Sequence, residues 1–382
     1  MAENDLGTHH VSSGSTNGGA EAKLVSFFHA VVKYDGSDLH LKAGSKPRVR
    51  IGGTIRTLQG EDLSNEQIEE MAFSIMTPML KDLFHRNGAI DFAYELKGAD
   101  RFRLNVYRQR GLTSISARRV ERNIPGFEEL HLPPQLPKLA EYRQGLILLS
   151  GITGSGKSTT IAAMLEYINK TRPCHVVTIE DPIEYIFEDK KAFIDQREIG
   201  IDVADFHEAL KYLMRQDPDV VLIGEMRDRH TFQAALQAAE TGHLVLGTIH
   251  SSTTSQTITR LLDLFPVEER PLIRQSLVSN LQAIITQRLL PSILKGVDRV
   301  PAVEILISNA PIRKMIAEER ESDILDVIKS NYDIGMQDFN ESFRHLVERE
   351  WVEADVAYEA SPNPEELKMR LKGIRSSQSG IL

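Results

Sequence analysis

The stretch that most constrains this chain is a glycine-rich segment, GITGSGKS, at residues 151–158. It matches the phosphate-binding pattern GxxxxGKS, and it lies between an apolar run at 146–149 and a helix-forming run at 160–165. This order of strand, loop and helix lets backbone N–H groups surround an anion, and the helix N-terminus adds partial positive charge. We therefore predict a nucleotide site in which Lys157 reaches the outer phosphates and Ser158 binds Mg²⁺. The residues predicted to bind the nucleotide are Gly151, Thr153, Gly154, Ser155, Gly156, Lys157, Ser158 and Thr159.

Composition and charge argue against several other kinds of protein. The 382 residues suggest two domains, and 41% hydrophobic residues are enough for a sizeable core. A net charge of −9 argues against a broad nucleic-acid surface, which needs clustered Lys and Arg. The single cysteine, Cys174, rules out an intrachain disulfide and a multi-cysteine zinc site, so a reducing cytoplasm is expected. The sequence has no apolar run long enough to span a membrane and no signal-peptide pattern.

Shifts in composition divide the chain into five segments. Residues 1–22 are rich in Gly, Ser, Thr, Asn and His, which predicts a disordered tail. Residues 23–120 combine helical and alternating patterns and predict a small α+β domain, and the four prolines within 121–144 indicate a linker. Residues 145–360 alternate helix and strand signals, which favours a mostly parallel sheet flanked by helices. Residues 361–382 predict a polar C-terminal tail.

In the small domain, apolar residues at helical spacing predict a helix from residue 21 to a stop at Asp35-Gly36. Along one predicted strand, Arg103 lies on the face opposite to the apolar Phe102 and Leu104, a pattern typical of a solvated charged face. The remaining predicted elements are strands at 38–41, 48–51 and 54–58, a helix at 65–84, and a meander at 91–96, 101–108 and 112–119.

In the large domain, Asp205 is predicted to cap a helix that runs toward residue 216, because Glu208 follows three residues later. After Pro266 the pattern is mainly helical, with one further strand at 302–307, and a short helix is predicted at 365–371. The other predicted elements are strands at 175–179, 220–223 and 244–249 and a helix at 231–240.

Two acidic clusters follow predicted strands, where an enzyme with a phosphate-binding loop needs carboxylates. Glu225 comes directly after the run VLIG, at the carboxyl edge of a parallel sheet beside the loop. The segment IEDPIE carries Glu180, Asp181 and Glu184, and its proline enforces a turn that aims a carboxylate back at the nucleotide. Each cluster alone is typical of surface carboxylates, but the two together indicate a hydrolase.

His243 and His250 flank one short predicted strand. A metal site is disfavoured, because the sequence suggests no third ligand at suitable spacing. Taken singly, each histidine is typical of a polar strand end.

Together these motifs resemble one family, the bacterial secretion and type IV pilus ATPases. The resemblance extends over residues 37–340 and is closest to the pilus retraction motors of that family. It implies an α/β fold in which a PAS-like N-terminal domain precedes a RecA-like motor domain, assembled as a hexameric ring with ATP between subunits. The runs that carry it are GITGSGKSTT, TIEDPIEY, QREIG, RQDPDVVLIGEMRD, AAETGHLVLGTIH and RLLDLFP, with SDLHL before them and GMQDFN after them.

The resemblance also implies roles for individual residues. Glu184 is the catalytic carboxylate of an Asp box that includes Glu180 and Asp181. Glu225 is the Walker B acid, which acts on Mg²⁺ directly or through water. The remaining implied catalytic residues are His243 and His250 of a His box, and Arg103 and Arg118, which match N-terminal-domain arginines near the phosphates.

The implied function is ATP-driven pilus retraction, with ATP and Mg²⁺ as cofactors. The implied partners are further copies of the chain and a pilus platform protein at the inner face of the cytoplasmic membrane, with no nucleic acid and no direct membrane insertion. Residues 310–316 resemble a short motif of the retraction motors with different spacing, so a paralogue of those motors and an extension or type II secretion ATPase stay open. From other classes, a nucleic-acid-dependent RecA-like motor and a non-hydrolysing scaffold stay open.

Overall fold

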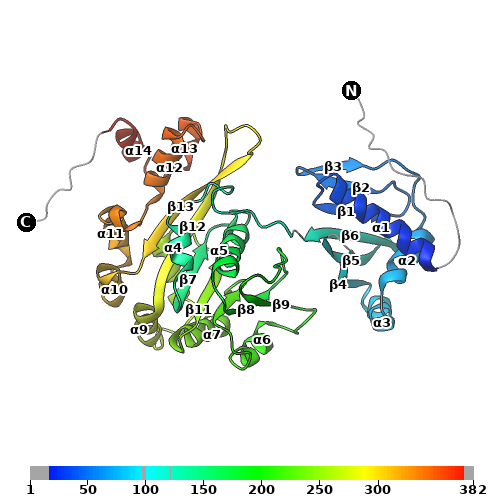
Figure 1. The fold of residues 1–382 in the computed structure, drawn as a ribbon, viewed down its shortest axis with the longest axis horizontal. Coiled ribbons are helices and arrows are strands. Elements are labelled where there is room, and N and C mark those ends of the chain that lie inside the picture. Colours follow the sequence, from blue (N-terminus) through cyan, green and yellow to red (C-terminus); the bar gives the residue numbers. More distant parts are fainter. Residues whose placement is uncertain (1–16, 97–99, 121, 374–382) are drawn as a thin grey trace, which may run out of the picture. The chain divides into compact units, whose positions relative to one another are not determined.

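The computed structural model describes residues 17–96, 100–120 and 122–373, in two compact units (Figure 1). The first unit covers the chain up to Asn123 together with residues 184–186, and the second covers the rest. The predicted tail at 1–22 lies largely outside the described residues. In the described parts of the chain, no helix is both long and apolar enough to cross a membrane.

The N-terminal unit is an antiparallel sheet with helices on one face, the α+β arrangement that was predicted. Its strand order is β3-β2-β1-β6-β5-β4. Alternate strand residues such as Leu39, Leu104 and Ala117 are buried together with helix residues such as Phe28 and Met71. The strands are β1 (Asp38–Lys42), β2 (Arg48–Ile51), β3 (Thr54–Thr57), β4 (Ala89–Glu95), β5 (Arg101–Gln109) and β6 (Leu112–Val120), and the helices are α1 (Asn17–Lys33), α2 (Asn65–Ile75) and α3 (Pro78–Asn87).

Two helix boundaries in this unit differ from prediction. Helix α1 begins at Asn17, before the predicted start at residue 21, and Ala20 packs against the core. The single helix predicted at 65–84 is two helices. Thr77 adopts an extended conformation and caps α3 with its side chain. Pro78 occupies the first turn, where the N–H that proline lacks would make no hydrogen bond within the helix. The chain therefore turns at a Thr-Pro pair that the apolar periodicity did not register.

The second unit is built on a seven-stranded sheet with the order β13-β12-β7-β11-β10-β8-β9. All neighbouring pairs are parallel except β12 with β13. The carboxyl ends of β7, β11, β10 and β8 therefore lie at one edge of the sheet. The strands are β7 (Gly145–Ser150), β8 (His175–Glu180), β9 (Phe193–Glu198), β10 (Val220–Ile223), β11 (Leu244–Ile249), β12 (Leu281–Pro291) and β13 (Arg299–Ile307).

Helices cover both faces of this sheet, as predicted. Ile147 and Leu149 of β7 are buried with α4 and α5, whereas Leu146 and Leu148 are buried with helices of the other face. This alternation explains why the strands read as continuous apolar runs. The helices on one face are α4 (Leu136–Ala140) and α5 (Lys157–Thr171), and those on the other are α6 (Phe206–Leu213), α7 (Arg229–Glu240), α8 (Thr254–Leu262), α9 (Arg270–Asn280), α10 (Ala310–Ala317) and α11 (Ile324–Lys329).

The prediction missed two strands of this sheet, β9 and β12. Strand β9 is an edge strand with three charged residues and little apolar patterning. Strand β12 follows α9 without a glycine or proline between them, so its apolar residues read as a continuation of helix. Its β-branched run Ile284, Ile285 and Thr286 fits a strand between two others.

The predicted linker and C-terminal tail are both partly packed. Leu132, Leu136 and Leu139, within the predicted linker, are buried against α5, so residues from Ile124 onward belong to the second unit. Helix α14 is longer by one residue than the short helix predicted in the tail, and its Leu367 is fully buried in a small core with Phe339. The C-terminal helices are α12 (Phe339–Glu348), α13 (Ala354–Ala360) and α14 (Pro364–Leu371).

Candidate active site

The glycine-rich loop joins the carboxyl end of β7 to the start of α5, the strand-loop-helix order predicted for a phosphate site. Gly156 caps α5 with a φ of 86°, a left-handed conformation that favours glycine. Lys157 is 8% exposed, and its Nζ donates to the carbonyl oxygens of Gly151 at 2.9 Å and Ile152 at 3.1 Å. The ammonium of this lysine is therefore held against the backbone of the loop.

Ser155 adds evidence that this loop holds a ligand. Its side chain is 2% exposed, and among the described residues its Oγ has no hydrogen-bond partner. A buried hydroxyl without a partner is costly, so an acceptor supplied by a ligand explains its position. The loop thus combines an ammonium, hydroxyls and a helix N-terminus, a donor set that fits the phosphates of a nucleotide.

Glu225 lies at the carboxyl edge of the sheet, two residues after Ile223, the last residue of β10, as predicted. His250, directly after β11, places its Nε2 3.0 Å from the Glu225 Oε1, and Arg227 Nη2 lies 2.6 Å from Oε2. The hydrogen bond from Arg227, followed by the charges of Arg227 and His250, lowers the pKa of the Glu225 carboxyl despite partial burial. Glu225 is therefore held as a carboxylate beside two cationic or hydrogen-bonding groups.

The end of β8 lies beside the end of β10. Ile223 is paired with Ile179, and a Cβ on Gly224 would approach the Ile179 carbonyl oxygen to 3.1 Å. A side chain at residue 224 would crowd this contact, because the two strand ends pass closely. The hydrogen bond to Glu225 and the charge of Glu225 raise the pKa of Arg227, and the charge of Asp181 adds to this, so both carboxylates act on the same guanidinium. The sheet therefore brings Asp181 of the segment IEDPIE near Arg227 and Glu225.

The three carboxylates of the predicted Asp box differ in their surroundings. Glu180 accepts hydrogen bonds from Thr178 Oγ1 at 2.7 Å and Gln196 Nε2 at 3.2 Å, so it is tied into β8 and β9. Asp181 precedes a cis proline, and Glu184 is exposed in the irregular segment that follows. Glu184 is thus open to solvent, whereas Glu180 supports the strand ends.

The two predicted histidines lie at opposite edges of the sheet. His250 follows β11 and contacts Glu225, but His243 precedes β11, and its carbonyl accepts from Gly145 N at the start of β7. The His243 Nδ1 lies 2.9 Å from the Ala238 carbonyl oxygen and 3.1 Å from Thr241 Oγ1. A six-residue strand spans about 20 Å, so His243 cannot reach the phosphate loop of its own chain, nor share a metal ion with His250. Within one copy, His243 is therefore separate from the cluster of Glu225 and His250, and its catalytic role stays a prediction.

Arg103 and Arg118 are direct neighbours on β5 and β6 of the N-terminal unit. They share the sheet face opposite to the helices. Arg118 Nε donates to Asp38 Oδ1 at 2.9 Å while its side chain remains 71% exposed, and Arg103 Nε lies 4.0 Å from Asp91 Oδ1. The two guanidinium groups thus lie side by side on the polar face of the sheet, with Arg118 more exposed than Arg103, which fits both a solvated surface and a phosphate contact.

Two residues near the loop were missed by the sequence analysis. Arg227 lies in the quoted run RQDPDVVLIGEMRD, and its spacing of two from Glu225 was an available signal. Gln287 lies on β12, 132 residues from its hydrogen-bond partner Ser155, so local patterns contain no signal for it.

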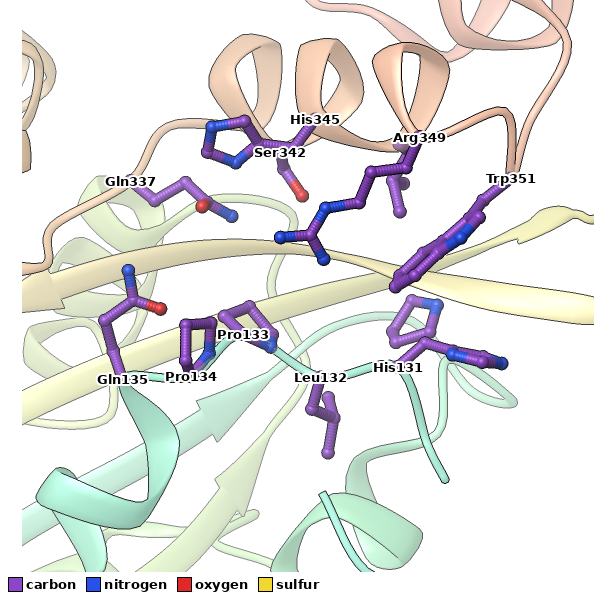
Figure 2. Close-up of a pocket in the computed structure, with 12 residues that line it drawn as sticks. His131, Leu132, Pro133, Pro134, Gln135, Gln337, Ser342, His345, Arg349 and Trp351 are labelled. Atoms are coloured by element: carbon purple, nitrogen blue, oxygen red, sulfur yellow. The ribbon is translucent and has the colours of Figure 1, made fainter. Parts of the chain in front are cut away.

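A cavity of about 110 Å³ lies elsewhere in the second unit, between residues 131–135 and α12. Arg349 extends into it beside Trp351, as Figure 2 shows, and the Trp351 ring centroid is 4.7 Å from that of His131. None of the residues predicted for the phosphate site lines this cavity. It is therefore separate from the loop and the acidic cluster.

Comparisons with known proteins agree with this geometry. Residues 111–325 match the family described as Type II/IV secretion system protein. The chain is 39% identical over 333 residues to the Type IV pilus retractation ATPase PilT of Pseudomonas aeruginosa, covering 87% of this chain and 96% of that protein. It is 38% identical over 321 residues to a twitching motility protein of Neisseria gonorrhoeae, covering 84% of this chain and 86% of that protein.

A solved structure extends the similarity to the fold. The crystal structure titled as the pilus retraction motor PilT with bound ADP superimposes with a TM-score of 0.84 at 41% identity, covering 90% of this chain and 98% of that chain. That similarity supports nucleotide binding and confirms the RecA-like α/β fold with a smaller N-terminal domain. The chain therefore belongs to the family of type II/IV secretion system ATPases.

Proposed function

We propose that this protein is an ATP-hydrolysing motor that powers the retraction of a type IV pilus. The observation that carries the proposal is the similarity to the Pseudomonas aeruginosa retraction ATPase over 96% of that protein's length. A phosphate loop, an acid and a histidine on neighbouring strand ends supply the chemistry that such a motor needs. As a member of this family, the protein is an ATP hydrolase.

The residues of this chain divide the work of hydrolysis between binding and activation. Lys157 and the backbone N–H groups of residues 151–159 hold the phosphates, and Ser155 Oγ has the burial of a group completed by ligand. Ser158 and, directly or through water, Glu225 would hold Mg²⁺, which when bound draws electron density from the phosphate oxygens. The oxygen donors present fit that ion. Glu184 positions the attacking water or accepts its proton, and its exposure leaves it accessible to water.

The arginines of the N-terminal unit complete the site from a neighbouring copy of the chain. Arg103 and Arg118 offset the negative charge on the phosphoryl group as it is transferred. Arg118 is suited to this role because most of its side chain is exposed while Asp38 holds its Nε, so its terminal nitrogens are oriented before a phosphate arrives. Asp38 is itself buried, and the hydrogen bonds from Ser37 and Arg118 lower its pKa despite that burial.

We further infer that six copies form a closed ring and that a platform protein recruits the ring to the cytoplasmic membrane. A ring is needed for this function because a loop and arginines from different copies form one site only in a head-to-tail assembly, and such assemblies close when the rotation permits. ATP hydrolysis then changes the relation of the two units within each copy, and the ring converts that change into pilus disassembly.

A deletion strain with a pilus assay tests the direction of the motor. Loss of twitching with an excess of surface pili is expected on deletion, and complementation by wild type but not by Lys157→Ala restores twitching. Loss of pili on deletion would identify an extension motor instead. Unchanged pili with altered motility would identify an accessory paralogue, and ATPase stimulation by DNA or RNA would identify a nucleic-acid motor.

A further inference from the structure

Strand β12 lies directly beside β7, the strand that leads into the phosphate loop. The odd-numbered residues Ala283 and Ile285 face the core that contains α5, and Gln287 continues this row at the level of the loop. Gln287 is 3% exposed although its side chain is polar. A buried amide in a sheet needs specific partners, and the partners of Gln287 lie in and next to the loop.

Both ends of the Gln287 amide are used. Its Nε2 donates to the carbonyl oxygen of Ser155 at 2.8 Å, and its Oε1 accepts from Thr160 Oγ1 at 2.8 Å. The orientation of the amide is fixed by chemistry, because a backbone carbonyl only accepts. Gln287 thus joins the middle of the loop to the first turn of α5 through one side chain.

The bond to Ser155 controls a peptide plane of the loop. The peptide between Ser155 and Gly156 is trans, as is every described peptide bond except the one before Pro182. In a trans peptide the C=O and the following N–H point in opposite directions. Because Gln287 holds the Ser155 carbonyl toward β12, it turns the Gly156 N–H away from β12. That N–H is one of the loop donors predicted to bind phosphate.

The backbone of the loop also rests on residue 287. A Cβ on Gly156 would lie 2.7 Å from the Gln287 Nε2, and a Cβ on Gly151 would lie 2.5 Å from the Gln287 carbonyl oxygen. Both distances are too short for a real side-chain atom. The absence of a side chain at these two glycines therefore lets residue 287 pack directly against the loop, in addition to their role around the ligand.

We infer that Gln287 is a positioning residue for the phosphate loop, and that its amide sets the affinity of the protein for nucleotide. The inference rests on the proposed function in one respect, namely that the loop binds ADP and ATP. Gln287 acts through the Ser155–Gly156 peptide and does not itself touch the phosphates.

Three variants separate positioning from packing. Gln287→Met keeps the length of the side chain and removes both hydrogen bonds, leaving the Ser155 carbonyl without its donor. Gln287→Glu keeps the acceptor for Thr160 and removes the donor to Ser155. Gln282→Met is the matched control, because Gln282 is the second residue of the same strand and lies at the opposite edge of the sheet.

The measurements are the affinity for a fluorescent ADP analogue, kcat and KM for ATP, and the thermal unfolding temperature without nucleotide. We expect Gln287→Met and Gln287→Glu to weaken ADP binding by roughly tenfold and to raise KM, since a loop group left without its partner costs this much. Gln282→Met should bind ADP as wild type does. A purely structural role would lower the unfolding temperature and leave the affinity of the folded protein unchanged.

Wild-type ADP affinity in folded Gln287→Met would overturn the inference. If that variant does not fold, Thr160→Val removes only the second hydrogen bond and should weaken ADP binding by a smaller factor; wild-type affinity there would likewise overturn it. Failure of the proposed function would show in the pilus assay and not in the affinity measurements. A protein that binds ADP but does not retract pili can still be compared with its Gln287 variants.

Discussion

Glu225 is the residue whose surroundings most clearly set its chemistry. Its carboxylate is held between Arg227, at 2.6 Å, and His250, at 3.0 Å, and these contacts lower its pKa. A lowered folded-state pKa gives stabilisation that is present above the unfolded pKa and is lost as pH falls through the folded value. The ionised form therefore persists into more acidic solution than an isolated glutamate permits.

Replacing Arg227 should shift the pH dependence of the enzyme. In Arg227→Met the largest cause of the lowered pKa is removed, so the pKa of Glu225 rises and activity is lost at a higher pH on acidification. The acid limb of kcat/KM against pH measures this. Arg229→Met is the control, because Arg229 pairs with Glu269 and not with Glu225. If the acid limb does not move, Arg227 does not control the ionisation of Glu225.

Glu184→Gln tests the assignment of the catalytic carboxylate. The amide preserves size and removes the base, so ATP affinity should stay near wild type while kcat falls by a hundredfold or more. Single-turnover hydrolysis and nucleotide titration give the two quantities. Loss of ATP binding in this variant would mean that Glu184 supports the fold of the site rather than the chemical step.

Sequence patterns placed candidate site residues where these residues follow predicted strands. The loop, Glu225 and His250 follow strands directly, so strand prediction placed them at one edge of the sheet. Gln287 was not identified, because its partner Ser155 lies 132 residues away in the chain and local patterns contain no signal for the contact. His243 and His250 flank β11, so the length of that strand, which the sequence predicted, separates them within one copy.

At the scale of elements, the helix caps show which local signals are reliable. Asp205 was predicted to cap a helix, and its Oδ1 accepts from Glu208 N at 2.9 Å at the start of α6. The signal is reliable because donor and acceptor are three residues apart. Strand β12 had no such signal, since a strand buried between two others shares its apolar pattern with a buried helix.

Asp205→Ala should therefore destabilise the second unit without affecting nucleotide binding. Loss of an N-cap costs about 1 kcal/mol, because one backbone N–H of the first turn loses its acceptor. Chemical denaturation measures the free energy of unfolding. Asp205→Asn retains an acceptor and should keep most of the stability, whereas equal losses in both variants would assign the effect to the charge near the helix N-terminus.

At the scale of the whole molecule, the described structure divides into a unit with the arginine pair and a unit with the loop. The sequence predicted both units, but it placed the start of the second unit too late, at residue 145 instead of Ile124. Prolines indicate a linker whether or not the segment is packed. Leu132, Leu136 and Leu139 are buried, which a proline count does not reveal.

Mixing two inactive variants tests whether neighbouring copies share one site. Arg103→Ala alone should slow turnover by a hundredfold or more, as loss of one charge-stabilising donor does elsewhere. In equal mixtures with Lys157→Ala, about one interface in four receives both an intact loop and an intact arginine in a head-to-tail ring. ATPase activity should therefore recover partially on mixing. No recovery after subunit exchange would place both groups in one copy.

The two faces of β12 contact different parts of the second unit, and this limits how the sequence of the strand can diverge. Gln287 faces the loop, whereas Arg288 faces the other way, donates from Nη1 to the Ala360 carbonyl oxygen at 2.9 Å and lies over Phe339. A one-residue insertion or deletion before this pair would exchange the two faces and displace both anchors. Point substitutions elsewhere on the strand have no such effect. We therefore expect related lineages to vary β12 in its side chains but to keep its length.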